Sequence, residues 1–444
     1  MGEELWKLGA AEAASGISAG EITSEALVQS CLDRIAERDE AVGAWIWLDP
    51  EMALEQARAR DAERARGYGT GPLHGVPVGI KDIIETADMP TQNGYRGHEG
   101  RHTHRDALCV SQLRDAGAVI LGKTVTTELA VRTPGNTKNP VNPAHTPGGS
   151  SSGSAAAVRD GQVPLALGTQ TGGSVIRPAS FCGIHALKPT FGMVARYGVT
   201  LQADWLDTVG TYGRSLEDVA LSAQQIWARD LTDPQAVPRS RAPLRDIAMS
   251  EPPSRPRIAF MRTAKWDEAD PAAQKTLEDF ATGLGADCQE VDMPDWMAQA
   301  WDWQHTLQMY GHAIHYGPLA DEHGELMSES LRISVAGGRE MTEAAYRHAI
   351  AQRDPVHEGL MEFYKDYDAI LCLPSAGPAP KGHDWTGDPV FNAFWTFAGT
   401  PCVNLPLLEI DGLPMGVQLT GPRGADGPLL RTARWVEQTA TAGA

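Results

Sequence analysis

The sequence contains few cysteines, few aromatic residues and few basic residues relative to acidic ones. Six of its 444 residues are cysteines, and no two form a Cys-x-x-Cys pair. This excludes a dense disulfide framework and predicts free, mostly buried thiols in a reducing compartment. Lysine and arginine total 38 against 57 aspartates and glutamates, a net charge of −19. That balance excludes the basic surface of a nucleic-acid-binding protein and disfavours binding to anionic membranes.

Several other patterns are missing as well. No run of about 18 apolar residues could cross a membrane. The N-terminus, Met-Gly-Glu-Glu-Leu-Trp-Lys, lacks the basic-then-apolar order of a secretory signal. Neither a Walker A motif nor G-x-G-x-x-G is present to predict a nucleotide site. We therefore expect a cytoplasmic globular protein without a nucleotide cofactor.

Apolar periodicity predicts an α/β protein. Residues 24–38 form an amphipathic pattern in which Leu27, Cys31 and Ile35 recur every four positions, with Thr23 or Ser24 as the N-cap. Short apolar runs then alternate with helical stretches, which favours a largely buried mixed or parallel sheet. The predicted strands here are 76–80, 118–121 and 163–167, and the predicted helices are 51–66, 106–116 and 151–159.

A stretch rich in proline, arginine and serine, at about 236–256, predicts a surface connection to a second α/β segment. We expect one domain over 1–444, with a variable, helical substrate-pocket region at about 296–353. The remaining predicted strands are 257–261, 288–291, 367–373 and 415–420, and the remaining helices are 271–284 and 429–441.

The most informative segment runs from Gly148 to Pro178. It holds two glycine-flanked serines, Ser150 and Ser174, 24 positions apart. Ser174 follows Thr-Gly-Gly, whose consecutive N–H groups could surround a developing oxyanion, so we predict an oxyanion hole from Thr171, Gly172, Gly173 and Ser174. The alternative for any single Gly-Gly-Ser is a structural turn.

Lys81 is the candidate base for these serines. It ends an apolar run, Val76 to Ile80, that could bury its side chain, and burial lowers a lysine pKa toward neutrality. Asp82 should point to the opposite face of the same strand. A serine with no obvious histidine partner but with a lysine base is an alternative to the usual catalytic triad. The competing interpretation of Lys81 is a surface strand end.

These motifs resemble the amidase signature family of serine hydrolases. The resemblance covers about 73–211 almost continuously and the C-terminal part more loosely. It rests on Gly-Val-Pro-Val-Gly-Ile-Lys-Asp (75–82), Ala-Gly-Ala-Val-Ile-Leu-Gly-Lys (116–123), Asn-Pro-Val-Asn-Pro (139–143), both serine loops, Gly-Asp-Pro-Val-Phe-Asn (387–392) and Gly-Val-Gln-Leu-Thr-Gly-Pro-Arg (416–423).

The resemblance implies a central mixed sheet covered by helices on both faces and a Ser-cisSer-Lys triad of Ser174, Ser150 and Lys81. The family spacing favours Ser150 for the serine that follows a cis peptide bond, with Ser151 second and Ser152 and Ser154 also open. It implies an acyl-enzyme on Ser174 and no cofactor or metal.

Within this family the sequence is most similar to malonamidase-type amidases and to aryl-amide and carbamate (urethane) hydrolases. Arg177 would hold the substrate carboxylate in a malonamidase-like enzyme, or else be structural. A glutamyl-tRNA amidotransferase A-type subunit is the other alternative, although its arginine usually lies one position earlier. We expect a small-molecule amide, ester or carbamate substrate, no nucleic-acid or membrane partner, and leave a homodimer open.

The less typical segment 296–316 is the candidate substrate pocket, with Trp303 and Met309 as its substrate-binding residues; the alternative is a helical core face. Three histidines at 98, 102 and 104 lack a metal-binding spacing, so a polar loop is the default. Cys182 has apolar neighbours, which predicts a buried thiol and not a nucleophile.

Overall fold

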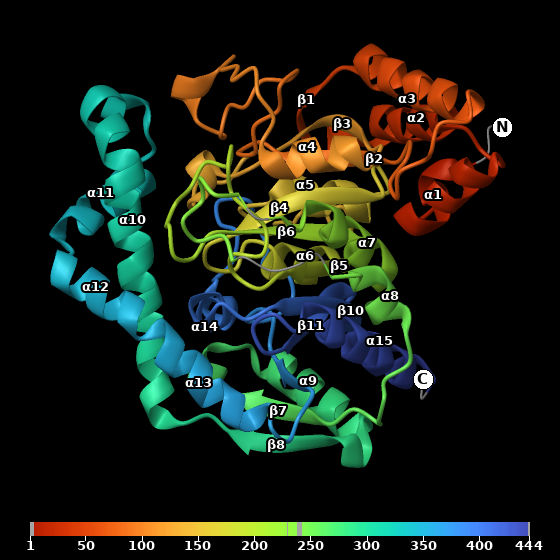
Figure 1. The fold of residues 1–444 in the computed structure, drawn as a ribbon. Helices are drawn as coiled ribbons and strands as arrows, with labels where there is room; N and C mark the ends of the chain where they lie inside the picture. Colours follow the sequence, from red (N-terminus) through yellow and green to blue (C-terminus); the bar gives the residue numbers. More distant parts are fainter. Residues whose placement is uncertain (1–3, 229, 238–241, 443–444) are drawn as a thin grey trace.

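A computed structural model describes residues 4–228, 230–237 and 242–442 of the chain. One eleven-stranded mixed sheet runs through this part, in the order β1-β3-β2-β4-β6-β5-β10-β11-β9-β7-β8, with flanking helices (Figure 1). The strands are β1 (Trp45–Leu48), β2 (Pro77–Lys81), β3 (Val119–Thr124), β4 (Leu165–Gln170), β5 (His185–Lys188), β6 (Thr208–Gly213), β7 (Ile258–Arg262), β8 (Cys288–Asp292), β9 (Ala369–Cys372), β10 (Cys402–Ile410) and β11 (Leu413–Thr420).

The sheet consists of two halves that follow the order of the chain. Strands β1 to β6 form one half and β7 to β11 the other, and they meet where β5 pairs antiparallel with β10. The pairs β2–β3, β2–β4, β7–β8 and β7–β9 are parallel, and the others are antiparallel. The predicted mixed sheet with flanking helices is thereby confirmed.

The helices that flank the sheet include one long element, α10, which lies along one side of the molecule and passes both halves (Figure 1). In the described residues the α-helices are α1 (Ala10–Ala19), α2 (Ser24–Val42), α3 (Pro50–Ala65), α4 (Leu108–Asp115), α5 (Ser152–Arg159), α6 (Ile176–Cys182), α7 (Leu216–Ile226), α8 (Leu244–Met249), α9 (Pro271–Gly283), α10 (Ala300–His323), α11 (Glu329–Glu340), α12 (Glu343–Ala351), α13 (Arg353–Phe363), α14 (Val390–Ala398) and α15 (Asp426–Ala442).

Local sequence signals explain several helix boundaries. The Thr23 side chain accepts a hydrogen bond from the backbone N–H of Ala26, so Thr23 and not Ser24 is the N-cap of α2. Asp49 caps α3 in the same way, and Pro50 occupies the first helical position, where its missing N–H leaves no hydrogen bond unmade.

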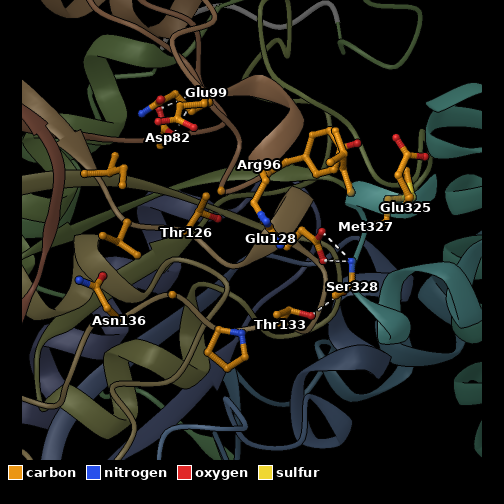
Figure 2. A pocket seen from close by; sticks show the side chains of 18 residues that line it. Asp82, Arg96, Glu99, Thr126, Glu128, Thr133, Asn136, Glu325, Met327 and Ser328 are labelled. Carbon is orange, nitrogen blue, oxygen red and sulfur yellow. Dashed lines mark hydrogen bonds between the residues drawn. The ribbon is translucent and has the colours of Figure 1, made fainter. Parts of the chain in front are cut away.

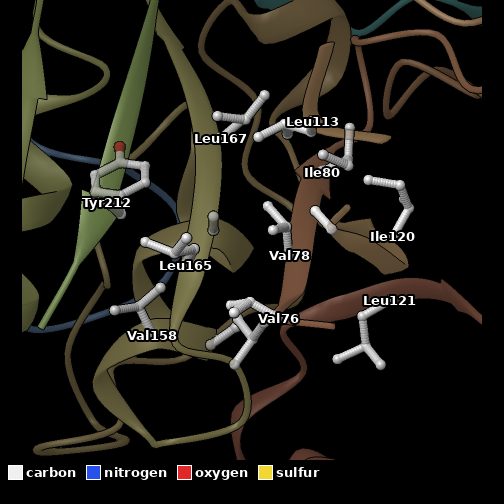
Figure 3. Packing of buried hydrophobic residues seen from close by; sticks show 14 of the residues in the cluster. Val76, Val78, Ile80, Leu113, Ile120, Leu121, Val158, Leu165, Leu167 and Tyr212 are labelled. Carbon is white, nitrogen blue, oxygen red and sulfur yellow. The ribbon is translucent and has the colours of Figure 1, made fainter. Parts of the chain in front are cut away.

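The core beneath the predicted catalytic lysine is built from β2, β3 and β4. Val78, Ile80, Leu165 and Leu167 are buried there, together with Tyr212 from β6 (Figure 3). Burying each such side chain stabilises the fold by roughly 1.5–3 kcal/mol. Because both faces of these strands are covered, Lys81 at the end of β2 is held inside the protein.

The predicted surface connection at about 236–256 is only partly a connection. Residues 238–241 lie outside the described part, and the following residues form α8. Leu244 and Ala248 are buried in the second half of the molecule because their four-residue spacing places both on one helix face. The sequence analysis did not anticipate this short helix, because the surrounding prolines and arginines masked its pattern.

Candidate active site

Lys81 lies at the end of β2 and contacts two hydroxyl groups. Its side chain is fully buried. Its Nζ donates hydrogen bonds to Ser150 Oγ and to Thr169 Oγ1, both at 2.7 Å. Thr169 lies on β4, which runs parallel to β2 with Ile80 opposite Leu167, so the sheet brings Lys81 and Thr169 to the same edge. The sequence reasoning missed Thr169 because this register is visible only in the sheet.

Burial determines the protonation of this lysine. Removal from water lowers the Lys81 pKa well below its ordinary 10.5, while the negative charge of Asp207 acts in the opposite direction. The neighbouring Asp82 does not oppose this effect. Its carboxylate pairs with Lys123 at 3.2 Å on the other side of the strand. Lys81 can therefore lose its proton at a lower pH than an exposed lysine and act as a base.

The hydrogen bonds of the first serine loop single out Ser150 among the four candidates. Ser150 is the serine that Lys81 contacts, and the peptide bond before it, Gly149–Ser150, is cis. The other hydroxyls donate to backbone carbonyl groups: Ser151 to Thr169, Ser152 to Gly148 and Ser154 to Leu167. These three bonds fix the loop and the start of α5, and they leave Ser150 next to the lysine.

The second serine loop, Thr171 to Ser174, is held through all four of its carbonyl groups and through the Thr171 hydroxyl. Among the hydrogen bonds of the described residues, each of its four carbonyl oxygens accepts one, and none of its four N–H groups donates one. The donors, in order, are Gln304 Nε2, Thr396 Oγ1, the Arg177 N–H and the Tyr212 hydroxyl. The N–H groups thus remain available for an oxyanion, which consecutive amides can stabilise.

Ser174 itself lies at the wall of a cavity of about 290 Å³. Its side chain is nearly buried, with the residue 8% exposed, and no hydrogen bond of the described residues involves its hydroxyl. The cavity is lined by the second serine loop, by Arg177, by one face of α10 and by the segment before α14. The α10 residues that line it are Trp301, Gln304, His305 and Gln308.

Two of the predicted substrate-binding residues lie elsewhere on the same helix. Trp303 packs against Phe397 and His348, and Met309 lies against Gly337 and Gly338 of α11. Neither residue lines the cavity. The cavity therefore does not support their assignment as substrate-binding residues. The segment was selected by its aromatic and methionine content, which does not determine the rotation of a helix. The polar residues Gln304 and Gln308, four positions apart, mark the face that lines the cavity.

Arg177 connects the two serine loops. Its Nε donates to the Thr386 carbonyl at 2.8 Å and its Nη2 to the Gly149 carbonyl at 2.6 Å, just before Ser150. Its Nη1 has no hydrogen-bond partner among the described residues although it is buried, and the residue lines the cavity. Burial lowers the Arg177 pKa to about 10. The side chain therefore positions the loop of Ser150 and keeps one donor for a ligand.

Asp207 supports the second loop from behind. Its carboxylate accepts a hydrogen bond from the Thr171 hydroxyl and from the N–H groups of Gln202 and Ala203. Burial raises the Asp207 pKa, and these three donors oppose that rise. This carboxylate was not a sequence candidate, because nothing in its local pattern places it beside Thr171.

The remaining sequence candidates take structural positions. Cys182 is buried with its pKa raised to about 12 by removal from water, which keeps it a thiol. His98 contacts Asn93, and the rings of His102 and His104 stack on each other. Within the described ranges, no three His, Cys, Asp or Glu side chains are grouped as metal ligands.

A larger cavity, of about 720 Å³, lies apart from Ser174 (Figure 2). It is lined by residues around Asp82, Tyr95, Thr126 and Glu128 and by residues 325–328, which precede α11. Neither Lys81 nor either catalytic serine lines it. The chemistry of the serine loops therefore belongs to the smaller cavity, whose walls hold the nucleophile and the free amides.

Comparisons with known proteins show the family of this chain. The amidase family model matches residues 26–430. The chain belongs to the amidase signature family. Among curated relatives, the A-type subunit of the glutamyl-tRNA(Gln) amidotransferase from Symbiobacterium thermophilum is 34% identical over 95% of this chain and 94% of its own length. The corresponding protein of Thermobifida fusca is 40% identical over 66% of this chain and 61% of its own.

Solved amidase structures show the same fold. The peptide amidase of Stenotrophomonas maltophilia is 29% identical with a TM-score of 0.86, over 98% of this chain and 97% of its own. A protein from a vestigial complex linked to the origins of an s-triazine catabolic enzyme is 26% identical with a TM-score of 0.90, over 97% and 98%. The chain is thus an enzyme of the amidase type that acts on C–N bonds. No helix of the described residues is long and apolar enough to span a bilayer.

Proposed function

We propose that this amidase hydrolyses the amide bond of small, uncharged substrates with an aromatic or apolar group, through an acyl-enzyme on Ser174. The observation that carries the proposal is the 2.7 Å contact between the buried Lys81 Nζ and Ser150 Oγ. A lysine whose pKa is lowered by burial can accept a proton through a bridging hydroxyl. Among the described residues of the two serine loops, Ser150 is the serine whose hydroxyl a lysine contacts.

In the proposed reaction, neutral Lys81 takes the Ser150 proton while Ser150 takes the proton of Ser174. The Ser174 oxygen forms a bond to the substrate carbonyl carbon, and the carbonyl π electrons move to the oxygen. The free N–H groups of Thr171 to Ser174 stabilise this oxyanion. When the C–N bond breaks, the proton returns through Ser150 to the departing nitrogen. Water then repeats the attack on the acyl-enzyme and releases the acid.

The cavity supports a substrate without a carboxylate. Two of the three nitrogens of Arg177 already bind backbone carbonyls, so it cannot grip a carboxylate through the two parallel hydrogen bonds that an arginine fork offers. The indoles of Trp301 and Trp385 and the amides of Gln304 and Gln308 supply apolar and neutral polar surface. Aryl amides fit these groups, as do aryl esters and carbamates, which present the same carbonyl geometry.

The curated relatives favour a second candidate, a glutamine-hydrolysing component of a tRNA-dependent amidotransferase. Such a protein would hydrolyse glutamine, whose carboxylate and ammonium groups need charged partners. Arg132 and Asp388 at the cavity wall could supply them. Glutamine turnover that greatly exceeds turnover of an aryl anilide would favour this candidate.

The deciding experiment compares steady-state hydrolysis of four substrates: an aryl anilide, a short aryl carbamate, malonamate and glutamine. The wild type and Arg177→Ala are assayed together, with Lys81→Met as the inactive reference. We expect the anilide or carbamate to be the best substrate and Lys81→Met to lose at least about 10³-fold in kcat. If malonamate is best and Arg177→Ala selectively abolishes its turnover, Arg177 is a carboxylate clamp and our substrate class is wrong.

A further inference from the structure

Residues of the segment 125–136 line both the 720 Å³ cavity of Figure 2 and the catalytic cavity, and no described residue lines both. Val125, Thr126 and Glu128 face the large cavity, whereas Ala130 to Arg132 line the catalytic one. Between them Leu129 and Ala130 both have positive φ angles, 46° and 59°, which turns the chain sharply. The large cavity is thus a separate compartment of a size typical of small-molecule sites.

The charges at the wall of this cavity are mostly negative. Glu99, Glu128 and Glu325 contribute carboxylates, and Arg96 is the only basic residue among the described residues that line it. A fourth carboxylate, Asp82, is already paired with Lys123. Glu128 is nearly buried, and its carboxylate accepts a hydrogen bond from the N–H of Ser328, as Figure 2 shows. Such a wall attracts a positively charged group.

A second observation points to a ligand at the same place. Thr126 is 3% exposed and lines the cavity, yet its hydroxyl has no hydrogen-bond partner among the described residues. Figure 2 shows this side chain among the cavity residues, between Arg96 and Asn136. Buried hydroxyl groups are nearly always hydrogen-bonded in folded proteins. An occupant with a hydrogen-bond donor or acceptor would satisfy this one, since a hydroxyl can accept as well as donate.

Apolar side chains complete the lining. Ile46, Val125, Leu326 and Met327 supply a surface for the body of a ligand. We propose that this cavity binds a small organic cation, an alkylammonium group on an apolar body, with the ammonium between Glu128 and the Thr126 hydroxyl. The site does not depend on the proposed hydrolase activity, so either one can fail without the other.

The test is calorimetric titration of the full-length protein with three probes of similar shape and different charge: 2-phenylethylammonium, 2-phenylethanol and 3-phenylpropanoate. We expect the ammonium compound to bind at least tenfold more tightly than the alcohol, with the carboxylate weakest. None of the probes contains an amide, so turnover does not interfere. Equal affinity for the alcohol and the ammonium compound would overturn the proposal.

Matched variants locate the bound probe. Thr126→Val removes the unpartnered hydroxyl that lines the cavity, and Thr127→Val removes an equally buried and unpartnered hydroxyl one residue further on that does not line it. We expect the first to weaken ammonium binding at least fivefold and the second to leave it unchanged. Glu128→Gln should weaken it at least tenfold, and Glu322→Gln, an exposed carboxylate away from the wall, should not.

Two further measurements keep this test decisive. The thermal midpoint of each variant shows that it is folded, and Thr126→Val is expected to keep the wild-type value because no protein partner loses a bond. Gln308→Leu alters only the catalytic cavity and should leave probe binding unchanged. A loss of binding in Gln308→Leu, or equal losses in the two threonine variants, would place the probe elsewhere and disprove the proposed site.

Discussion

At the scale of single residues, Lys81 illustrates how burial prepares a base. Inside the sheet the charged ammonium group of Lys81 loses its hydration by water. The two hydroxyl partners at 2.7 Å do not stabilise the charge as a carboxylate counter-charge would. Asp207 is the one carboxylate that pulls its pKa upward. The balance between burial and Asp207 therefore sets the pH at which the enzyme gains its neutral base.

This balance predicts a pH shift. Because the neutral lysine is the active form, kcat/KM should rise with pH through the Lys81 pKa, well below 10.5. Asp207→Asn removes a negative charge that raises this pKa, so the acid limb of the profile should move to lower pH. Asparagine can still bond to Thr171 with the donor and acceptor reversed.

The measurement is the pH dependence of kcat/KM for the best amide substrate. Asp279→Asn changes an exposed carboxylate of α9 that does not line the catalytic cavity, so it is the control and should leave the acid limb of the profile unchanged. An acid limb that moves to higher pH in Asp207→Asn would contradict the proposed role of Lys81 as the neutral base.

At the scale of elements, α10 positions the second serine loop. The Gln304 side chain donates to the Thr171 carbonyl at 3.2 Å, and Gln308 lines the same cavity one turn later without contacting that loop. We predict that Gln304→Leu lowers kcat by about tenfold, equivalent to about 1.4 kcal/mol, with a smaller change in KM, because a loop carbonyl loses its donor.

Steady-state kinetics of Gln304→Leu and Gln308→Leu on one substrate test this prediction. Gln308→Leu removes the Oε1 atom that accepts from Gln304 Nε2 but leaves the donor to the Thr171 carbonyl in place, so it should lower kcat less than Gln304→Leu does. If both variants change KM alone, Gln304 binds substrate and does not position the loop.

The helices α10 and α11 approach closely at one glycine. A Cβ at Gly338 would lie 2.0 Å from the Met309 carbonyl oxygen of α10, whereas a Cβ at Gly337 would meet only the flexible end of the Met309 side chain at 2.9 Å. We predict that Gly338→Ala lowers the free energy of unfolding by about 1–3 kcal/mol. Gly337→Ala should change it by less than about 1 kcal/mol, since its helix propensity improves. Urea denaturation measures both, and equal effects would contradict this packing argument.

These elements also show how far the sequence could be interpreted. The N-cap of α2, the apolar strands β2, β3 and β4, and the pairing of Lys81 with a serine of the first loop follow from local patterns and from the family motifs. Thr169, Asp207 and Gln304 do not. Their contacts depend on sheet register and on the rotation of α10, which are fixed by long-range packing and leave no local pattern.

At the scale of the whole molecule, the active site combines both halves of the sheet. Lys81 and the two serines come from the first half, whereas α10 and the segment before α14 close the cavity from the second. The halves meet at β5 and β10, and the Asn404 side chain reinforces this junction by donating to the Ile184 carbonyl at 2.8 Å. Helix α6, which follows the nucleophile, packs on the second half through Ser180, whose hydroxyl accepts from the Gly416 N–H.

Because one continuous sheet crosses this junction, we predict that the two halves unfold together. Far-ultraviolet circular dichroism and tryptophan fluorescence should then report the same urea midpoint, although chains of this length often unfold in stages. Asn404→Ala removes a buried hydrogen bond and should lower the free energy of unfolding by about 1–3 kcal/mol. Both midpoints should fall by the same amount, since the junction belongs to both halves. Separate midpoints in the wild type, or a shift of one probe alone in Asn404→Ala, would mean that each half is stable by itself and that the catalytic cavity is assembled by docking.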